Sequence, residues 1–193
     1  VDKSGNGNSA TAGGTGAAYS SSQKALLFGS LTASPEAGGQ RTFTSGNYYT
    51  TPYTAAPANE TCFVVFSMPV LGFGFMITSH TCSGRSFGTP LYNGVVATLA
   101  GGVICASWGV TALASISTST IYIGELITSS GNQFGTVNGG TLAGPVSQSY
   151  NAGTTTDIGG FIALNGYYFN GYIYEIIFYN TALTDTQRQQ VEG

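Results

Sequence analysis

Charged side chains are scarce in this sequence. Asp, Glu, Lys and Arg make up only 7% of its 193 residues, against about 25% in ordinary soluble domains. The net charge is −3, and the five basic residues stand too far apart to predict a continuous stripe along a phosphate backbone. We therefore do not expect nucleic acid as a partner. The basic residues are Lys3, Lys24, Arg41, Arg85 and Arg188.

Long apolar runs are lacking as well. No stretch approaches the roughly 18 consecutive apolar residues that span a bilayer, and Val1 does not open a basic and then apolar secretion signal. We therefore expect no membrane insertion. Because the chain begins without an initiator Met, we interpret it as a processed chain or as a portion of a longer one. Its length fits one all-β unit, and we expect residues 1–193 to form a single domain.

Cysteine and histidine are also few. Cys62, Cys82 and Cys105 show neither the Cys-x-x-Cys spacing of a zinc site nor the even number of a closed disulfide framework. We expect buried free thiols, with one disulfide and one leftover thiol as the alternative. His80 is the only histidine, and no second histidine or acidic cluster lies near it in the sequence. These residues therefore indicate neither a metal site nor a catalytic relay.

Glycine and strand-forming residues are abundant instead. Hydrophobic residues reach 42% and glycines number 29, so Ser, Thr, Asn and Gly must cover a surface of the kind usual for extracellular or particle-borne β proteins. Runs rich in β-branched and aromatic residues alternate with Gly, Ser and Asn clusters, whereas helical periodicity is nearly absent. The sequence therefore predicts an all-β antiparallel sandwich. The clearest strand runs are 62–68, 72–77, 94–99, 103–108, 121–127 and 172–179.

Two of these runs are apolar on both faces. Because successive side chains of a strand point to opposite sides, residues 62–68 and 172–179 should form central strands that are covered above and below. Residues 1–23 are too rich in glycine and small polar residues for core strands and should form an ordered loop or an edge. For residues 129–156 we expect long loops and short edge strands.

Only the end of the chain predicts a helix. Thr184 supplies a hydroxyl at the N-cap, Asp185 an acid in the first turn, and Gln187 the side chain that completes a reciprocal capping box. Gly193 stands where a helix usually ends. We expect one short C-terminal helix between these positions.

The C-terminal region also resembles a known family. Residues 170–188 (NGYIYEIIFYNTALTDTQR) resemble the closing signature of laminin G-like, concanavalin A-like domains, in which Gly-x-Ile-x-Glu is followed by apolar-x-Tyr-Asn and a Leu-Ser/Thr-Asp turn into a short helix. Residues 2–8 (DKSGNGN) are similar to the family's opening motif, and residues 157–160 (DIGG) resemble the Ile-Gly-Gly before its last strand. These matches bracket almost the whole chain, whereas the middle third matches only loosely.

The resemblance implies a two-sheet antiparallel jelly-roll sandwich. Such domains occur in lectin-like, adhesion and polysaccharide-directed proteins, and in structural and fibre proteins of large DNA viruses and phages. Some hold calcium with loop oxygens, for which Asp2 and Asp157 are the candidates here, but neither has a second carboxylate at a short spacing. We therefore expect no cofactor.

The acidic residues do not predict a glycosidase. That chemistry usually needs two carboxyl groups roughly 5 to 9.5 Å apart, and none of the eight acids reproduces the Glu-x-Asp-x-x-Glu strand pattern of glucanases with this fold. Glu125 stands alone. Glu175 shares a predicted strand face with Ile173, so we expect it to be partly buried and paired, with Arg188 as its nearest partner in the sequence. We therefore expect no enzyme.

Aromatic residues give the strongest indication of binding. Twelve Tyr, eleven Phe and one Trp exceed what one core must bury. Tyr rings can stack on the apolar face of a sugar while amides and hydroxyls bind its hydroxyl groups. The alternative is that these rings fill the sandwich edge or a subunit contact. The candidate ligand-binding residues are Asn165, Tyr167, Tyr168, Asn170, Tyr48, Tyr49 and Tyr150.

These observations favour a non-catalytic surface module of a viral particle or secreted assembly, located at a virion surface or outside the cell. Its expected partners are glycans, capsid proteins or other surface proteins. The alternative is a purely structural minor capsid or fibre protein without a ligand, and a glycan-cleaving enzyme comes third. Asn59, in the loop-like sequon Asn59-Glu60-Thr61, is a candidate N-glycosylation site.

Overall fold

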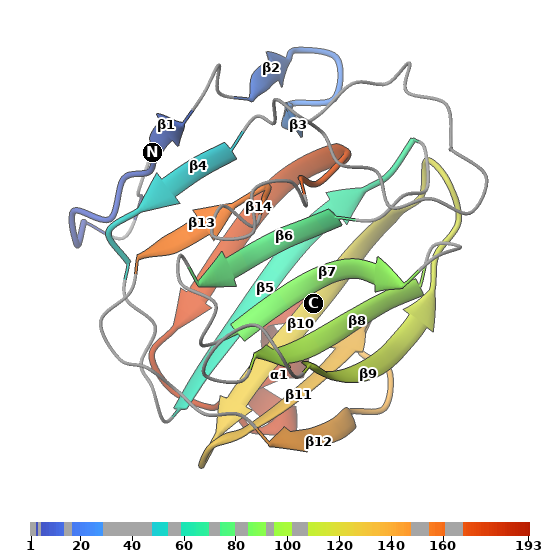
Figure 1. Cartoon of the computed structure of the whole chain (residues 1–193). Helices are drawn as coiled ribbons and strands as arrows, with labels where there is room; N and C mark the ends of the chain where they lie inside the picture. Colours follow the sequence, from blue (N-terminus) through green and yellow to red (C-terminus); the bar gives the residue numbers. More distant parts are fainter. Residues whose placement is uncertain are drawn as a thin grey trace.

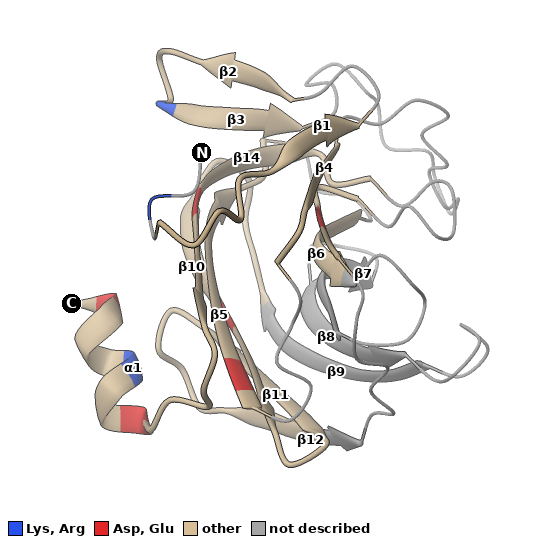
Figure 2. Ribbon diagram, turned by 90° about the vertical axis from the view of Figure 1, so that its left-hand side faces the viewer, with Lys and Arg blue, Asp and Glu red and all other residues tan. Residues whose placement is uncertain are grey.

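The computed structural model of the chain describes residues 3, 5–13, 17–28, 48–53, 59–69, 74–79, 85–91, 95–101, 108–147, 155–160 and 168–193. Their strands form two layers of seven strands each, and neighbouring strands within a layer are antiparallel (Figures 1 and 2). This arrangement confirms the predicted two-sheet jelly-roll sandwich. Among the described segments, no helix is long and apolar enough to cross a membrane.

The first layer, sheet A, contains the strands that carry the candidate site. Its order is β1 (Thr11–Gly13), β4 (Tyr48–Thr51), β13 (Thr156–Ile158), β6 (Gly74–Ser79), β7 (Arg85–Leu91), β8 (Val95–Gly101) and β9 (Trp108–Ser115).

The second layer, sheet B, contains the longest strands. Its order is β12 (Ala143–Ser147), β11 (Asn132–Val137), β10 (Ile121–Ser129), β5 (Asn59–Ser67), β14 (Gly171–Tyr179), β3 (Ala25–Phe28) and β2 (Ala18–Ser20). The two runs that are apolar on both faces are therefore central, as predicted, because β5 lies between β10 and β14. Strands β1, β2 and β12 stand at sheet edges, which confirms the expectations for residues 1–23 and for part of residues 129–156.

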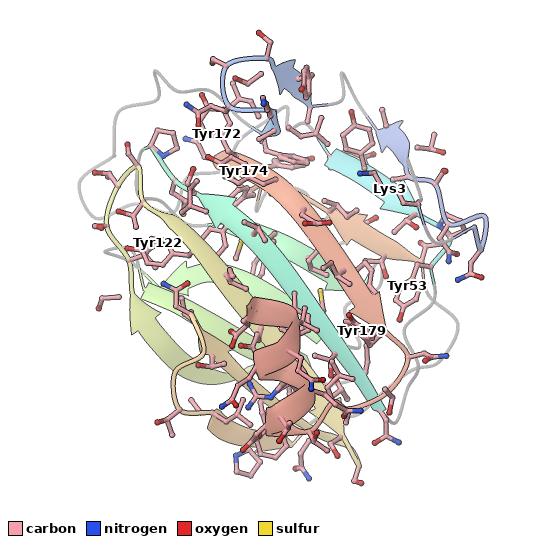
Figure 3. The ribbon with its side chains drawn as sticks, turned by 180° about the vertical axis from the view of Figure 1, so that it is seen from behind. Lys3, Tyr53, Tyr122, Tyr172, Tyr174 and Tyr179 are labelled. Atoms are coloured by element: carbon pink, nitrogen blue, oxygen red, sulfur yellow. The ribbon has the colours of Figure 1, made fainter. Side chains whose placement is uncertain are left out.

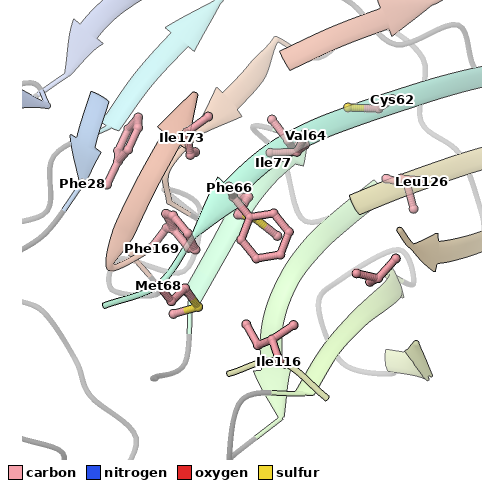
Figure 4. Close-up of a cluster of buried hydrophobic side chains, with 12 residues drawn as sticks. Phe28, Cys62, Val64, Phe66, Met68, Ile77, Ile116, Leu126, Phe169 and Ile173 are labelled. Atoms are coloured by element: carbon pink, nitrogen blue, oxygen red, sulfur yellow. The ribbon is translucent and has the colours of Figure 1, made fainter. Parts of the chain in front are cut away.

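The hydrophobic core fills the space between the sheets (Figure 4). In β5, every second side chain from Cys62 to Phe66 points inward, which is the period-two alternation of a strand. Each fully buried large side chain contributes about 1.5–3 kcal/mol to folding. The fully buried members of the cluster are Phe28, Cys62, Val64, Phe66, Met68, Met76, Ile77 and Phe169.

Strand β14 departs from the predicted alternation. Ile173 pairs with Phe66 of β5, but Glu175 pairs with the next residue, Val65, so Tyr174 is an extra residue in a β-bulge. The bulge turns Glu175 to the outer face, where it is exposed, while Ile173 stays in the core. The expectation that Glu175 is partly buried beside Ile173 is therefore wrong, and β14 is less covered on its outer face than predicted.

The predicted C-terminal helix is confirmed as α1 (Asp185–Glu192). The Thr184 side chain accepts a hydrogen bond from the backbone N–H of Gln187, the Gln187 side chain accepts one from the backbone N–H of Thr184, and Gly193 is the C-cap. The helix lies on the outer face of sheet B (Figure 3). It is held there by Arg188, whose guanidinium reaches Glu125 of β10.

Some strands were misplaced or missed by sequence reasoning. The run 103–108 was expected as a strand, but the described strand begins at Trp108, and residues 103–107 lie outside the described residues. Strand β7 was not predicted, since Gly88 and Pro90 interrupt its apolar pattern.

Candidate functional site

A buried carboxylate lies on the outer face of sheet A, the face away from the core. Asp157 of β13 pairs with Thr50 of β4, and the Thr50 hydroxyl donates a hydrogen bond to Asp157 Oδ1 at 2.8 Å. The neighbouring pair, Ile158 and Tyr49, packs against the core, so the alternation of the strands directs Asp157 and Thr50 away from it. Asp157 is fully buried, and a buried carboxylate of this kind marks a candidate functional site.

Two tyrosines from distant parts of the sequence stack beside this carboxylate. The ring centroids of Tyr48 and Tyr168 lie 6.2 Å apart, with their planes inclined by 24°. Tyr48 precedes Thr50 by two residues in β4 and therefore lies on the same face. We call Tyr48, Thr50, Asp157 and Tyr168 the Tyr48–Asp157 cluster.

Close backbone approaches hold the cluster in place. The backbone N–H of Phe169 donates a hydrogen bond to Gly159 O, and Tyr168 forms a parallel bridge with Phe75. A Cβ on Gly74 would lie 2.4 Å from Tyr168 O, so glycine is needed where β6 meets this segment. The Tyr48 ring lies over Gly13 in the same way, with Cε2 at 2.0 Å from an added Cβ.

The surroundings keep the Tyr168 phenol neutral. Burial raises the pKa of Tyr168, and the neighbouring Tyr48 and Asp157 raise it further. The cluster therefore combines two hydroxyl-bearing rings with an aliphatic hydroxyl and a carboxyl group. Such a set can stack on an apolar ring face and exchange hydrogen bonds with hydroxyl groups.

The structure separates the other predicted site residues. Tyr49 points inward, where its ring packs edge-on against Phe28 and its hydroxyl donates to Ala17 O at 3.3 Å, so it belongs to the core and not to the ligand-contact face. Asn170 is 4% exposed, and within the described part of the chain its Oδ1 has no hydrogen-bond partner. Three further candidates, Tyr150, Asn165 and Tyr167, lie outside the described residues, as do Asp2, His80, Cys82 and Cys105.

The glycosylation candidate is not in a loop. Asn59 is exposed and begins strand β5, where it pairs with Ser129. Thr61 of the sequon is buried and accepts a hydrogen bond from the backbone N–H of Leu183. The loop-like reading of this sequon is therefore wrong.

A group of ionisable side chains lies under α1, where none was expected. Arg188 pairs with fully buried Glu125 at 2.5 Å and with Asp185 at 2.8 Å, so the predicted pairing of Arg188 with Glu175 is wrong. Glu125 therefore does not stand alone. Arg188 and Glu125 are enclosed between α1 and sheet B, whereas the Tyr48–Asp157 cluster belongs to strands of the opposite layer (Figure 2).

Cys62 is the one cysteine among the described residues. Cys62 is a buried free thiol, as predicted for that residue, and burial raises its pKa. Among the described residues, no three His, Cys, Asp or Glu side chains gather closely enough to hold a metal ion. Sequence reasoning named Asp157 only as a calcium candidate and did not select Thr50, since no local pattern joins β4 to β13.

Comparison by sequence finds no matching protein-family model and no matching curated protein. Comparison by structure finds many solved structures with a similar fold. Domain 4 of AbnA, a GH43 extracellular arabinanase from Geobacillus stearothermophilus, in complex with arabinotriose, has a TM-score of 0.65 and 14% identity, over 100% of this chain and 92% of that one. The binding domain of botulinum neurotoxin DC in complex with SialylT has a TM-score of 0.64 and 15% identity, over 99% of this chain and 47% of that one.

The third likeness is to an enzyme. A family 7 alginate lyase in complex with its product has a TM-score of 0.59 and 12% identity, over 86% of this chain and 84% of that one. The expectation that the chain is not an enzyme is therefore wrong. It was based on the missing carboxylate pattern of glucanases, which concerns glycoside hydrolysis, whereas the same fold also carries a lyase. At these identities the likenesses establish architecture, and the chain has the concanavalin A-like, laminin G-like jelly-roll fold.

Proposed function

We propose that the chain is a saccharide-binding module and that the Tyr48–Asp157 cluster is its contact site. The observation that carries this proposal is the meeting of two tyrosine rings with a buried carboxylate on one sheet face, from segments more than 100 residues apart in the sequence. The complexes of AbnA domain 4 with arabinotriose and of the botulinum neurotoxin DC binding domain with SialylT lend it support by analogy of fold.

The cluster suits a saccharide for a physical reason. Sugar rings present apolar C–H faces that pack on aromatic rings, and their hydroxyl groups both donate and accept hydrogen bonds. Buried Asp157 would orient the Thr50 hydroxyl through their hydrogen bond, while Thr50 and the two phenols can donate to or accept from sugar hydroxyls. Recognition of this kind needs no net charge on the ligand.

Isosteric substitutions test the site. Asp157→Asn removes the charge with little change in shape, and Thr50→Val removes the hydroxyl that donates to Asp157. We expect each to weaken the binding of arabinotriose, or of another neutral oligosaccharide selected on a glycan array, by about tenfold, which corresponds to about 1.4 kcal/mol. Calorimetry on the purified chain measures this.

Asp185→Asn is the matched control, because its side chain is 79% exposed on α1 and belongs to the other layer. Unchanged binding in Asp157→Asn, with the fold intact by circular dichroism, would remove the cluster as the site. Chromatography of the saccharide after incubation shows whether the site also cleaves what it binds. Shorter products that are missing with Asp157→Asn would identify the cluster as an active site.

We also propose that the module belongs to the surface of a viral particle or of a secreted assembly. The support is compositional: 7% charged residues and a surface of neutral hydroxyl and amide groups. Antibody labelling of intact particles and of culture fluid tests the location. Labelling of particles without saccharide binding would favour the alternative of a structural capsid or fibre component, whose partners are its neighbouring subunits.

A further inference from the structure

The outer face of sheet B is divided into two halves. The helix α1 covers one half, where Glu125 and Ile127 of β10 are buried. Tyr172 and Tyr174 of β14 lie on the other half, close to each other and both partly exposed (Figure 3). Their ring centroids are 6.4 Å apart and their planes are inclined by 43°.

The bulge in β14 produces this pair. Tyr174 is the extra residue between Ile173 and Glu175, so its side chain emerges on the outer face next to Tyr172. Buried Ser67 lies within 3.0 Å of the Tyr174 hydroxyl, which also donates to Gln23 Oε1 at 3.2 Å. The Tyr174 ring is therefore anchored from β5 and from the β2–β3 turn.

Partly exposed apolar side chains continue the surface across the sheet. Val65 of β5 and Ile123 of β10 pair with each other and are both partly exposed, and Ile121 is 55% exposed. Among the described residues, an acid, Glu175, and a base, Lys24, flank this surface, and both are exposed. We call Gln23, Ser67, Tyr172 and Tyr174 the outer tyrosine patch.

We infer that the outer tyrosine patch is a second contact site for neutral saccharides, on the opposite face of the sandwich from the Tyr48–Asp157 cluster. Two anchored rings offer faces for sugar C–H groups, and Gln23 with the Tyr174 hydroxyl offers polar partners at their edge. Glu175 and Lys24 at its rim carry opposite charges, so this pair favours neither an anion nor a cation. The ligand class rests on the proposed function, whereas the position of the patch does not.

The shape of this face favours a narrow occupant. The helix α1 projects from sheet B on the same side as the patch (Figures 2 and 3). A two-fold contact with a second copy would have to seat the same patch on itself beside two projecting helices. A single saccharide chain can lie on the rings without that obstruction. The module would then hold two saccharide chains at once, one on each face.

Calorimetry with arabinotriose, cellotriose and maltotriose tests the inference on the full chain. We expect two molecules of the bound trisaccharide per chain. The double variant Tyr172→Ala/Tyr174→Ala should retain one, whereas Asp157→Asn should retain both and bind one of them about tenfold more weakly. Tyr174→Phe and Ser67→Ala both keep the two aromatic rings and remove only a hydroxyl group. Each should therefore weaken binding at the second site by about threefold to tenfold without abolishing it. Tyr19→Ala, which removes a tyrosine that is 67% exposed on β2, is the matched control and should change nothing.

The outcomes separate this inference from the proposed function. One molecule per chain whose binding only Asp157→Asn weakens would overturn the second site and leave the proposed function standing. One molecule per chain that only the double variant removes would overturn the Tyr48–Asp157 cluster as the site and leave the second site standing. No binding of any of the three probes would overturn both. A monomer–dimer equilibrium in sedimentation that the double variant abolishes would show a second copy as the occupant and overturn the inference. If the double variant does not fold, unchanged affinity in Tyr174→Phe and Ser67→Ala decides against it.

Discussion

Glu125 and Asp157 are two fully buried carboxyl groups in different surroundings. Asp157 accepts a hydrogen bond from the Thr50 hydroxyl, whereas Glu125 faces a guanidinium that already binds Asp185. The pKa of Glu125 is raised to about 7: burial is the largest cause, hydrogen bonding with Glu192 adds to it, and Arg188 acts in the opposite direction. Within the described part of the chain, Oε1 of Glu125 and Oε1 of Glu192 are both buried without a hydrogen-bond partner. A proton on Glu125 would supply the missing donor.

The raised pKa of Glu125 predicts a stability that falls as pH rises. Between an unfolded pKa near 4.5 and a folded pKa of about 7, the folded chain binds more protons than the unfolded chain, so stability is greatest below this window and is lost through it. We expect a loss on the order of 2–3 kcal/mol between pH 4.5 and pH 7.5. Urea unfolding at intervals of pH measures it.

Glu125→Gln provides the comparison for this prediction. Its stability should lose the downward slope, because glutamine keeps the hydrogen bond to Arg188 and does not titrate. His80 is present in both proteins, so its own titration cancels in the difference. Parallel pH curves for the two proteins would contradict the raised pKa of Glu125.

At the scale of elements, α1 is stabilised both by its own cap and by its ion pair. The Thr184 hydroxyl accepts a hydrogen bond from the backbone N–H of Gln187 at 3.3 Å, and the Gln187 side chain accepts from the backbone N–H of Thr184 at 2.9 Å. Arg188 then anchors the helix to β10 through Glu125. A short helix of eight residues would not be stable without such contacts.

Thr184→Ala should destabilise the chain by about 1 kcal/mol, the usual contribution of an N-cap side chain. Guanidinium unfolding followed by far-UV circular dichroism measures the change. Thr186→Ala is the control, since Thr186 is exposed in the first turn and alanine is the better helix former there. Equal stability in the two variants would show that the cap contributes nothing once Arg188 is paired.

The elements themselves could largely be predicted from the sequence. Strands β5, β10 and β14 and the capped helix follow from alternation, β-branched content and the Thr184-to-Gln187 spacing. The side on which Glu175 lies could not be predicted, because one extra residue in a bulge reverses the alternation and leaves no local mark in the sequence. The partner of Arg188 could not be predicted either, because Glu125 is 63 residues away in the sequence.

At the scale of the whole molecule, the candidate site depends on pairings that the sequence does not reveal. Tyr48 and Tyr168 were both predicted as site residues because they lie in segments rich in Tyr and Asn. Their stacking, however, requires that β4 pairs with β13 and that the Phe169 N–H donates a hydrogen bond to Gly159 O. Neighbouring Tyr49 was selected on the same grounds and lies in the core, because one step along a strand changes the face.

The scarcity of charge leads to a prediction about salt. With 7% charged residues and a net charge of −3, the chain offers little long-range field, and a neutral saccharide offers none. Stacking and hydrogen bonding act at contact distance. Salt shortens the Debye length to about 3 Å at about 1 M, but this screening weakens interactions between charges and does not act on a neutral ligand. We therefore expect the dissociation constant for a neutral trisaccharide to change by less than about twofold between roughly 0.01 M and 1 M sodium chloride.

Titration calorimetry at both concentrations measures this, with sialyllactose as a charged comparison. Binding of sialyllactose alone, with a steep loss of affinity in salt, would mean that an ionic contact carries recognition, and it would point away from the tyrosine rings and toward residues such as Lys3 and Lys24.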